Sequence, residues 1–226
     1  MSVSALSESA QNYLKAVWSL GEWTDDPVTA STIAARVGVR MSTASDAVRK
    51  LAEQGLVDHE RYGAVRLTPE GRRHAVAMVR RHRLIETFLV EVLGYRWDQV
   101  HDEAETLEHA VSDFLVERID AHLGRPERDP HGDPIPRADG TVHRPDATRL
   151  SGLAPGARAV VERIADDDPE LLNHLADHAV GFGVAITVRP SAPFSETVEI
   201  EVDGPDPAQL ALGRAAADAV WVRVLS

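Results

Sequence analysis

The sequence predicts a mainly α-helical fold with small β parts. Apolar residues recur at helical spacing over most of residues 7–123, whereas residues 55–60 and 64–68 alternate as strands do. A strand-rich pattern resumes after residues 124–155, which hold six of the 13 prolines and read as a linker or a loop laid on a surface. We expect three domains, at residues 1–73, 74–147 and 148–226.

The first domain has the pattern of a helix-turn-helix motif. Helices are expected over residues 7–20, 28–37 and 41–51, with Thr29 capping the second and Gly38 in the turn before the third. The third helix opens with small polar residues, which allow close approach to the major groove of DNA.

The two alternating stretches would form a hairpin around Arg61-Tyr62-Gly63, the wing of a winged helix-turn-helix domain. A helical pair with an unrelated hairpin is the alternative. The charge distribution favours DNA binding. The net charge of −12 alone argues against it, but residues 36–83 carry 11 Lys and Arg against 5 Asp and Glu. Residues 84–226 carry 12 against 27, so a basic segment is joined to an acidic body.

Two composition features limit the function further. The chain has no cysteine, so any metal must be held by oxygen and nitrogen atoms. Neither a signal pattern nor an apolar run of membrane-spanning length is present, so a cytoplasmic protein without a membrane partner is expected.

Metal-ligand residue types gather in the middle of the chain. Helices are expected over residues 69–93 and 97–123, with apolar faces for mutual packing and a dimer interface. On the second helix one face would carry His101, Glu105, Glu108 and His109, and on the first His82 and Glu86 repeat the four-residue spacing. Carboxylates this close repel one another, which a divalent cation would relieve. A solvated, charge-rich helix face is the alternative.

Weaker candidates lie elsewhere. Asn12, just before the apolar stripe of the first helix, is either a surface group or a weak oxygen ligand. Asp129 and His131 are better explained by a solvated loop. Asp167 and Glu170 belong to an acidic run at a helix start, where the helix dipole favours carboxylates without any ligand.

The third domain is expected to be small and β-rich. Strands are predicted at residues 157–164, 184–188, 197–202 and 220–224, with a helix at 169–177.

In this order of parts the chain resembles the diphtheria-toxin-repressor family of metal-dependent transcription regulators. The resemblance rests on the winged helix, the pair His82 and Glu86, the Glu105-x-x-Glu108-His109 element after His101, and the His-Gly-Asp-Pro-Ile-Pro segment that begins at His131. It implies a homodimer with an SH3-like C-terminal domain.

The resemblance also implies two metal sites per subunit. One would use Glu105, Glu108 and His109 with Asn12. The other would lie around His82, Glu86 and His101, completed by the loop residues Asp129 and His131 or by Asp167 and Glu170 of the third domain.

Within the family, iron-responsive members carry Met on the first helix and Cys at the position of Glu105, whereas manganese-responsive members carry Asp and Glu. Glu105 and the absence of thiolate therefore favour Mn²⁺, with Fe²⁺ as the alternative. Two departures stand out. Asn12 replaces the expected Asp, and Lys15 stands where a two-metal subset places Glu, although an ammonium repels a cation.

The implied function is a Mn²⁺-dependent repressor of metal-uptake genes that binds an inverted-repeat operator in double-stranded DNA as a dimer. An Fe²⁺-dependent repressor of iron homeostasis is the alternative. The implied DNA-contacting residues are Arg40, Ser42, Thr43, Ser45, Asp46, Arg49 and Lys50. Asp46 would accept a hydrogen bond from cytosine or cap the helix. A dinuclear metalloenzyme is disfavoured because no separate nucleophile or general base is recognisable, and no small organic substrate is expected.

Overall fold

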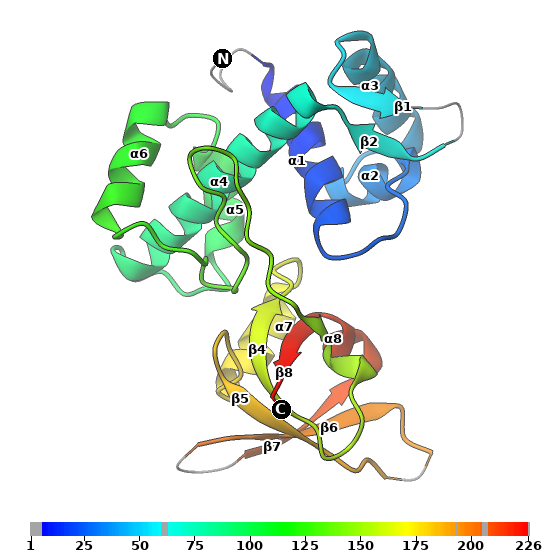
Figure 1. The fold of residues 1–226 in the computed structure, drawn as a ribbon, viewed down its shortest axis with the longest axis vertical. Coiled ribbons are helices and arrows are strands. Elements are labelled where there is room, and N and C mark those ends of the chain that lie inside the picture. Colours follow the sequence, from blue (N-terminus) through cyan, green and yellow to red (C-terminus); the bar gives the residue numbers. More distant parts are fainter. Residues whose placement is uncertain (1–5, 60–62, 193, 205–207, 226) are drawn as a thin grey trace. The chain divides into compact units, whose positions relative to one another are not determined.

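The computed structural model describes residues 6–59, 63–192, 194–204 and 208–225 (Figure 1). The chain forms two compact units, and helix α4 (Pro69–Glu91) contributes to both. The first unit comprises Met1–His82, Thr106–Arg118 and Pro136–Thr141, and the second comprises Arg83–Glu105, Ile119–Ile135 and Val142–Ser226. The boundaries of these two units differ from those of the three predicted domains, and the three-domain division stays a prediction.

The first unit begins with a winged helix-turn-helix head, as predicted. Its elements are α1 (Glu8–Glu22), α2 (Ala30–Val37), α3 (Met41–Glu53), β1 (Val57–His59) and β2 (Val65–Leu67). They share one apolar core, which includes Leu14, Val17, Ile33, Ala44, Val48, Leu51, Val57 and Val65. The apolar stripe of each helix is therefore buried against the other two, and the polar face of α3 is left outside.

The ends of α2 follow from its capping residues. Thr29 and Thr32 form a capping box, in which the Thr29 hydroxyl accepts from the Thr32 amide at 3.2 Å. Gly38 ends the helix with a left-handed φ of 71°, a conformation that favours glycine. Both predicted boundary residues are confirmed.

The wing is the antiparallel pair of β1 and β2, with Val57 opposite Leu67. The amide of Val65 donates to the carbonyl of Val28 at 2.7 Å, which ties the wing to the segment before α2. In the predicted turn of the wing, Arg61 and Tyr62 lie outside the described residues.

The single helix predicted over residues 97–123 is wrong. The structure has α5 (Val100–Leu107) and α6 (Asp113–His122), separated by a turn. The amides of Ala110 and Val111 both donate to the Leu107 carbonyl, which ends the regular ladder, and the Ser112 hydroxyl accepts from the Leu115 amide at 3.2 Å to start α6. Glu108 and His109 therefore lie in the turn after α5, not on one helical face with His101.

The second unit contains an antiparallel six-stranded sheet with the order β3-β8-β4-β5-β6-β7. The strands are β3 (Thr148–Arg149), β4 (Arg158–Ile164), β5 (Ala185–Arg189), β6 (Thr197–Val202), β7 (Ala208–Gly213) and β8 (Val220–Val224). Two helices, α7 (Pro169–Asp177) and α8 (Arg214–Asp218), and a 3-10 turn at Leu150–Gly152 complete it. The predicted bounds of β6, α7 and β8 are confirmed, whereas β3, β7 and α8 were not predicted.

The sheet closes around its own core, which includes Leu150, Val161, Ile164, Leu172, Leu175, Ile186, Ile200, Leu212 and Val222. Trp97, from the segment before α5, packs against this core. Of the helices in the described part of the chain, none is long and apolar enough to cross a membrane.

Candidate functional site

The proline-rich stretch contains a buried loop at residues 129–136. Asp129 and His131 are buried in it, so the expectation of a solvated loop is wrong. The Asp129 carboxylate accepts from the amides of His131 and Asp133, both at 2.9 Å. The Ile164 amide donates to the His131 carbonyl at 2.9 Å, so the end of β4 holds the loop. Asp129 thus satisfies the backbone of a turn that would otherwise be costly to bury.

Two arginines balance the acidic charge of this loop. Arg83 of α4 donates to the Pro134 carbonyl at 2.7 Å and to Asp133 at 3.2 Å. Arg163 of β4 donates to both carboxylate oxygens of Asp133 at 2.8 Å. Buried charges need such partners, so the loop is held rigidly against α4 and β4.

Three donors from separate elements of the second unit meet beside this loop. Glu86 of α4, His101 of α5 and Asp166 after β4 each offer a ligand atom, and these atoms lie within 4.8 Å of one another. The His101 Nδ1 lies 3.0 Å from Asp166 Oδ2 and 3.4 Å from Glu86 Oε1. Glu86, Asp129 and His131 form a second such group, so the completely buried Glu86 belongs to both.

His131 is oriented as a metal ligand would be. Its Nε2 donates to the Trp97 carbonyl at 2.8 Å, and its ring stacks on Trp97 with centroids 5.7 Å apart. The Nδ1 is buried and has no hydrogen-bond partner among the residues that the structure describes. A backbone carbonyl that fixes one ring nitrogen leaves the other to bind a proton or a metal. This donor set fits a divalent cation.

The pKa values show that the cluster favours positive charge. Burial alone would lower the pKa of His101, but hydrogen bonds and charge from Asp166 and Glu86 outweigh it and raise the pKa to about 10. For His131, too, burial acts downward, but Glu86 and Asp129 raise its pKa. Burial and the charge of Asp133 raise the pKa of Asp129 to about 8.

The structure places the other expected ligands of the second site differently. Asp166, which we did not predict, joins the cluster, whereas among the described residues the groups able to hold a metal do not include Asp167 or Glu170. Glu170 is exposed at the start of α7, where its amide donates to Asp168. The acidic residues 166–170 indicated the correct segment. Which of their carboxylates turns inward depends on the backbone path after β4. Glu105, which was expected at the other site with Glu108 and His109, is half exposed, with Oε1 3.7 Å from His101 Nε2.

Glu108 has a different environment, in the first unit. Its completely buried carboxylate accepts from Lys15 Nζ of α1 at 2.7 and 2.9 Å, and lies 2.6 Å from Nδ1 of His82. Burial raises the pKa of Glu108, but His82 and Lys15 lower it more. An ammonium group already neutralises this carboxylate, so as built the position does not fit a divalent cation.

His109 is also engaged. Its Nδ1 donates to Oε1 of Gln11 at 2.9 Å, and the Gln11 amide nitrogen donates to the Leu6 carbonyl at 2.9 Å. The neighbouring Asn12 is half-buried. Gln11 was missed because the family resemblance placed the ligand one position later, and a helix rotates by 100° per residue.

The polar face of α3 is the candidate DNA interface. Of the residues expected to contact DNA, Arg40, Ser42, Thr43, Asp46, Arg49 and Lys50 are exposed and Ser45 is half-buried. Asp46 contacts Arg49 at 3.4 Å, and Arg49 donates to Glu53 at 3.0 Å. The helix begins after Arg40, so the suggestion that Asp46 caps it is wrong.

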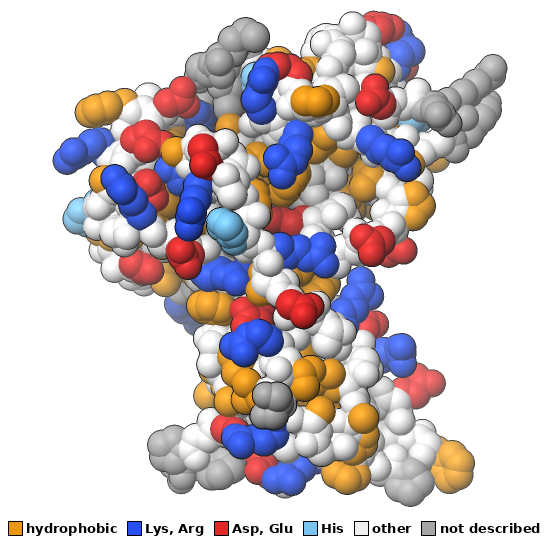
Figure 2. Space-filling view, viewed as in Figure 1, with side chains coloured by type: hydrophobic (Ala, Val, Ile, Leu, Met, Phe, Trp, Pro, Cys, Tyr) orange, Lys and Arg blue, Asp and Glu red, His pale blue; other side chains and the backbone are white. Residues whose placement is uncertain are grey.

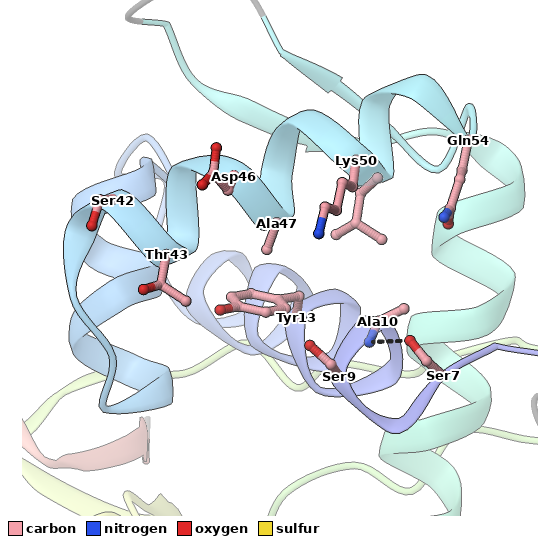
Figure 3. Close-up of a pocket in the computed structure, with 11 residues that line it drawn as sticks. Ser7, Ser9, Ala10, Tyr13, Ser42, Thr43, Asp46, Ala47, Lys50 and Gln54 are labelled. Atoms are coloured by element: carbon pink, nitrogen blue, oxygen red, sulfur yellow. Dashed lines mark hydrogen bonds between the residues drawn. The ribbon is translucent and has the colours of Figure 1, made fainter.

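A polar groove of about 460 Å³ lies between α1 and α3. Figure 3 shows Thr43 and Lys50 of α3 facing Ser9 and Tyr13 of α1 across it. Hydroxyl and ammonium groups of this kind bind phosphate oxygens. On the face drawn in Figure 2, acidic and basic side chains are intermixed, so the interface is identified by α3 and not by one basic patch.

The loop geometry predicts a strong effect of Gly132→Ala. Gly132 has φ 93°, and an added Cβ would lie 2.2 Å from the Glu162 carbonyl oxygen, so we expect a loss of about 2–4 kcal/mol in the free energy of unfolding. Gly140→Ala is the matched control: φ is 84° but nothing lies within 4 Å of the added Cβ, so the loss should be about 1 kcal/mol. Denaturant unfolding of both variants checks the difference, and equal losses would contradict the packing described.

Metal binding at the cluster is expected to release protons. His101, with its pKa raised to about 10, is protonated at neutral pH and must lose that proton to coordinate a metal. The affinity for a divalent metal should therefore rise with pH between 6 and 8, by about tenfold per pH unit for each proton released. Calorimetry in buffers of different ionisation enthalpy counts the protons, and a count of zero would argue against His101 as a ligand.

Three family models match the chain. They describe the N-terminal DNA-binding domain of iron-dependent repressors at residues 5–65, their metal-binding and dimerisation domain at residues 68–137, and a FeoA domain at residues 148–224. Among curated proteins, the iron-dependent repressor IdeR of Mycobacterium leprae (strain TN) is 32% identical over 198 residues, covering 82% of this chain and 86% of the relative.

Solved structures show the same similarity. A manganese-dependent transcriptional repressor in complex with manganese has a TM-score of 0.91 and 54% identity, covering 96% of this chain and all of that one. The manganese regulator SloR has a TM-score of 0.79 and 32% identity, covering 96% and 98%. The chain therefore belongs to the diphtheria-toxin-repressor family of metal-dependent, DNA-binding transcription repressors, which act as dimers and are not enzymes.

Proposed function

We propose that this repressor responds to Mn²⁺ and controls metal-uptake genes by binding an inverted-repeat operator. The observation that carries the proposal is a pair of donor groups that share the buried Glu86. One group joins Glu86 to His101 and Asp166, the other joins it to Asp129 and His131, and every donor is a carboxylate oxygen or an imidazole nitrogen. Carboxylate oxygens suit Mn²⁺, and the chain has no thiolate that would favour a softer ion. The 54% identity to a manganese-bound repressor supports the same metal.

An Fe²⁺-dependent repressor is the second candidate. The curated relatives include iron-dependent repressors, and imidazole nitrogen also suits iron. The two candidates share the same cluster and differ only in its metal preference.

At the cluster, the cation would be held by Glu86, His101, His131 and Asp166, with Asp129 beside them. A bound metal supplies two positive charges where the metal-free protein has only protonated imidazoles. The four ligands come from four separate segments, namely α4, α5, the buried loop and the segment after β4. In the metal-free protein the protonated His101 balances the carboxylates of Glu86 and Asp166, and a divalent cation would replace that proton as the source of positive charge. A ligand changes the populated conformation only when it binds one arrangement better, and this cluster provides that difference.

At the DNA, we propose that α3 of each subunit enters the major groove, with the two helices about 34 Å or a multiple apart. Ser42, Thr43, Ser45 and Asp46 would face bases, whereas Arg40, Arg49 and Lys50 would bind phosphate. We place the protein with the chromosome in the cytoplasm and retain the domain division at residues 73/74 and 147/148.

The metal assignment is tested by DNA binding at controlled free metal. Fluorescence anisotropy with a labelled operator should show weak binding in EDTA and strong binding with Mn²⁺. For each ion, the free concentration that gives half-maximal DNA binding is divided by the free concentration of that ion in the cell. This ratio should be lower for Mn²⁺ than for Zn²⁺ or Fe²⁺. Glu86→Ala with His131→Ala should abolish the response, while Glu170→Ala, a nearby exposed carboxylate, should preserve it. Metal-independent binding would remove the switch, and an equal response to Fe²⁺ would remove the manganese assignment.

Dimerisation is expected to use α6. Phe114 and Leu115 are 76% and 45% exposed in the single chain, which is unusual for adjacent large apolar residues. Phe114→Glu should shift the dimer dissociation constant upward by at least about tenfold, since it places a charge in an apolar contact. Analytical ultracentrifugation measures the shift. Phe194→Glu alters a more exposed phenylalanine of the second unit and should leave the dimer intact; equal weakening by both would contradict the assignment.

A further inference from the structure

Lys15 occupies the position where the family resemblance places a metal. Its Nζ lies 2.7 Å and 2.9 Å from the two carboxylate oxygens of Glu108, so one ammonium group contacts both oxygens. The Lys15 side chain is 13% exposed and that of Glu108 is completely buried. This is a desolvated ion pair, unlike the exposed pairs on α3.

The surroundings of the pair leave little room for a second cation. Nδ1 of His82 lies 2.6 Å from Oε2 of Glu108 and 3.4 Å from Lys15 Nζ. His109 donates its Nδ1 proton to Gln11, and its Nε2 lies 3.6 Å from Oε1 of Glu108, so this imidazole also lies against the carboxylate. A divalent ion at Glu108 would have to displace the ammonium or lie beside it, where two positive charges repel strongly in a buried site.

Positions 12 and 15 of the first helix provide no acidic ligand. A metal at this position would gain an anionic oxygen if residue 12 or 15 were acidic, but the chain has the neutral Asn12 and the cationic Lys15. Lys15 thus balances the charge of Glu108 in place of a metal. The cluster at Glu86 differs, because its acidic groups are joined mainly by imidazoles, which a metal can deprotonate and bind.

We propose that Lys15 is the resident cation of Glu108, so that α1 is tied to the turn after α5 by an ammonium–carboxylate pair at all metal concentrations. The chain then binds one divalent metal per subunit where the resemblance implies two. Metal control would act through the Glu86 cluster alone. The metal count rests on the proposed function, whereas the Lys15 pair does not.

The first test counts bound metal. Equilibrium dialysis against Mn²⁺ followed by elemental analysis should give about one ion per subunit for the unaltered chain and about two for Lys15→Glu, because two facing carboxylates would need a cation. Ser9→Glu places a new carboxylate at an exposed position of the same helix and should still give about one. Two ions in the unaltered chain, or no gain in a folded Lys15→Glu variant, would overturn the proposal.

The second test needs no metal. In EDTA, Lys15→Met and Glu108→Gln should each lower the melting temperature, and the double variant should lose clearly less than the two single losses combined, since each single change leaves a buried charge without its partner. Additive losses would overturn the pair. If the unaltered chain bound no metal, the proposed function would fail while this cycle would still decide the role of Lys15.

Discussion

The structure depends on the need of each buried carboxylate for positive charge. Glu86, Glu108, Asp129 and Asp133 are all buried, and an unpaired carboxylate in such a position would be strongly destabilising. Arginines supply the charge at Asp133, and Lys15 supplies it at Glu108. At Glu86 the partners are imidazoles, whose charge depends on protonation. We therefore propose that, of these four positions, Glu86 is the one that exchanges its positive charge for that of a metal.

That difference separates a structural role from a regulatory one. Ammonium and guanidinium groups have no lone pair for a metal, so we assign the contacts at Glu108 and Asp133 a structural role. The pKa of His101 is raised to about 10, so this imidazole is protonated at neutral pH. A metal that binds there must compete with the proton. Metal sensing by this chain is thus expected to depend on pH more steeply than a site built from carboxylates alone.

Much of the fold could be predicted from the sequence because it rests on local signals. Thr29 and Gly38 bound α2, and the limits of β6, α7 and β8 follow from alternation and capping. The break between α5 and α6 was missed because the apolar spacing continues through Ser112, and only the backbone bonds at Leu107 show the end of the ladder.

The candidate site was predictable by residue type but not by grouping. The resemblance indicated Glu86, His101, Asp129 and His131 as members of one site. It could not show that Asp166 and not Asp167 turns inward, or that Gln11 and not Asn12 reaches His109, because a shift of one residue depends on backbone direction. Lys15 was noticed as a departure, but its contact with Glu108 joins residues 93 positions apart and needed the three-dimensional structure.

The central claim is that one buried cluster, and not Glu108, holds the metal. Crystals grown with Mn²⁺ and measured on both sides of the manganese absorption edge give an anomalous difference map that locates each ion directly. The account predicts one peak per subunit, within coordination distance of Glu86, His101, His131 and Asp166, with Lys15 still on Glu108. A peak on Glu108 with the Lys15 side chain displaced would contradict it.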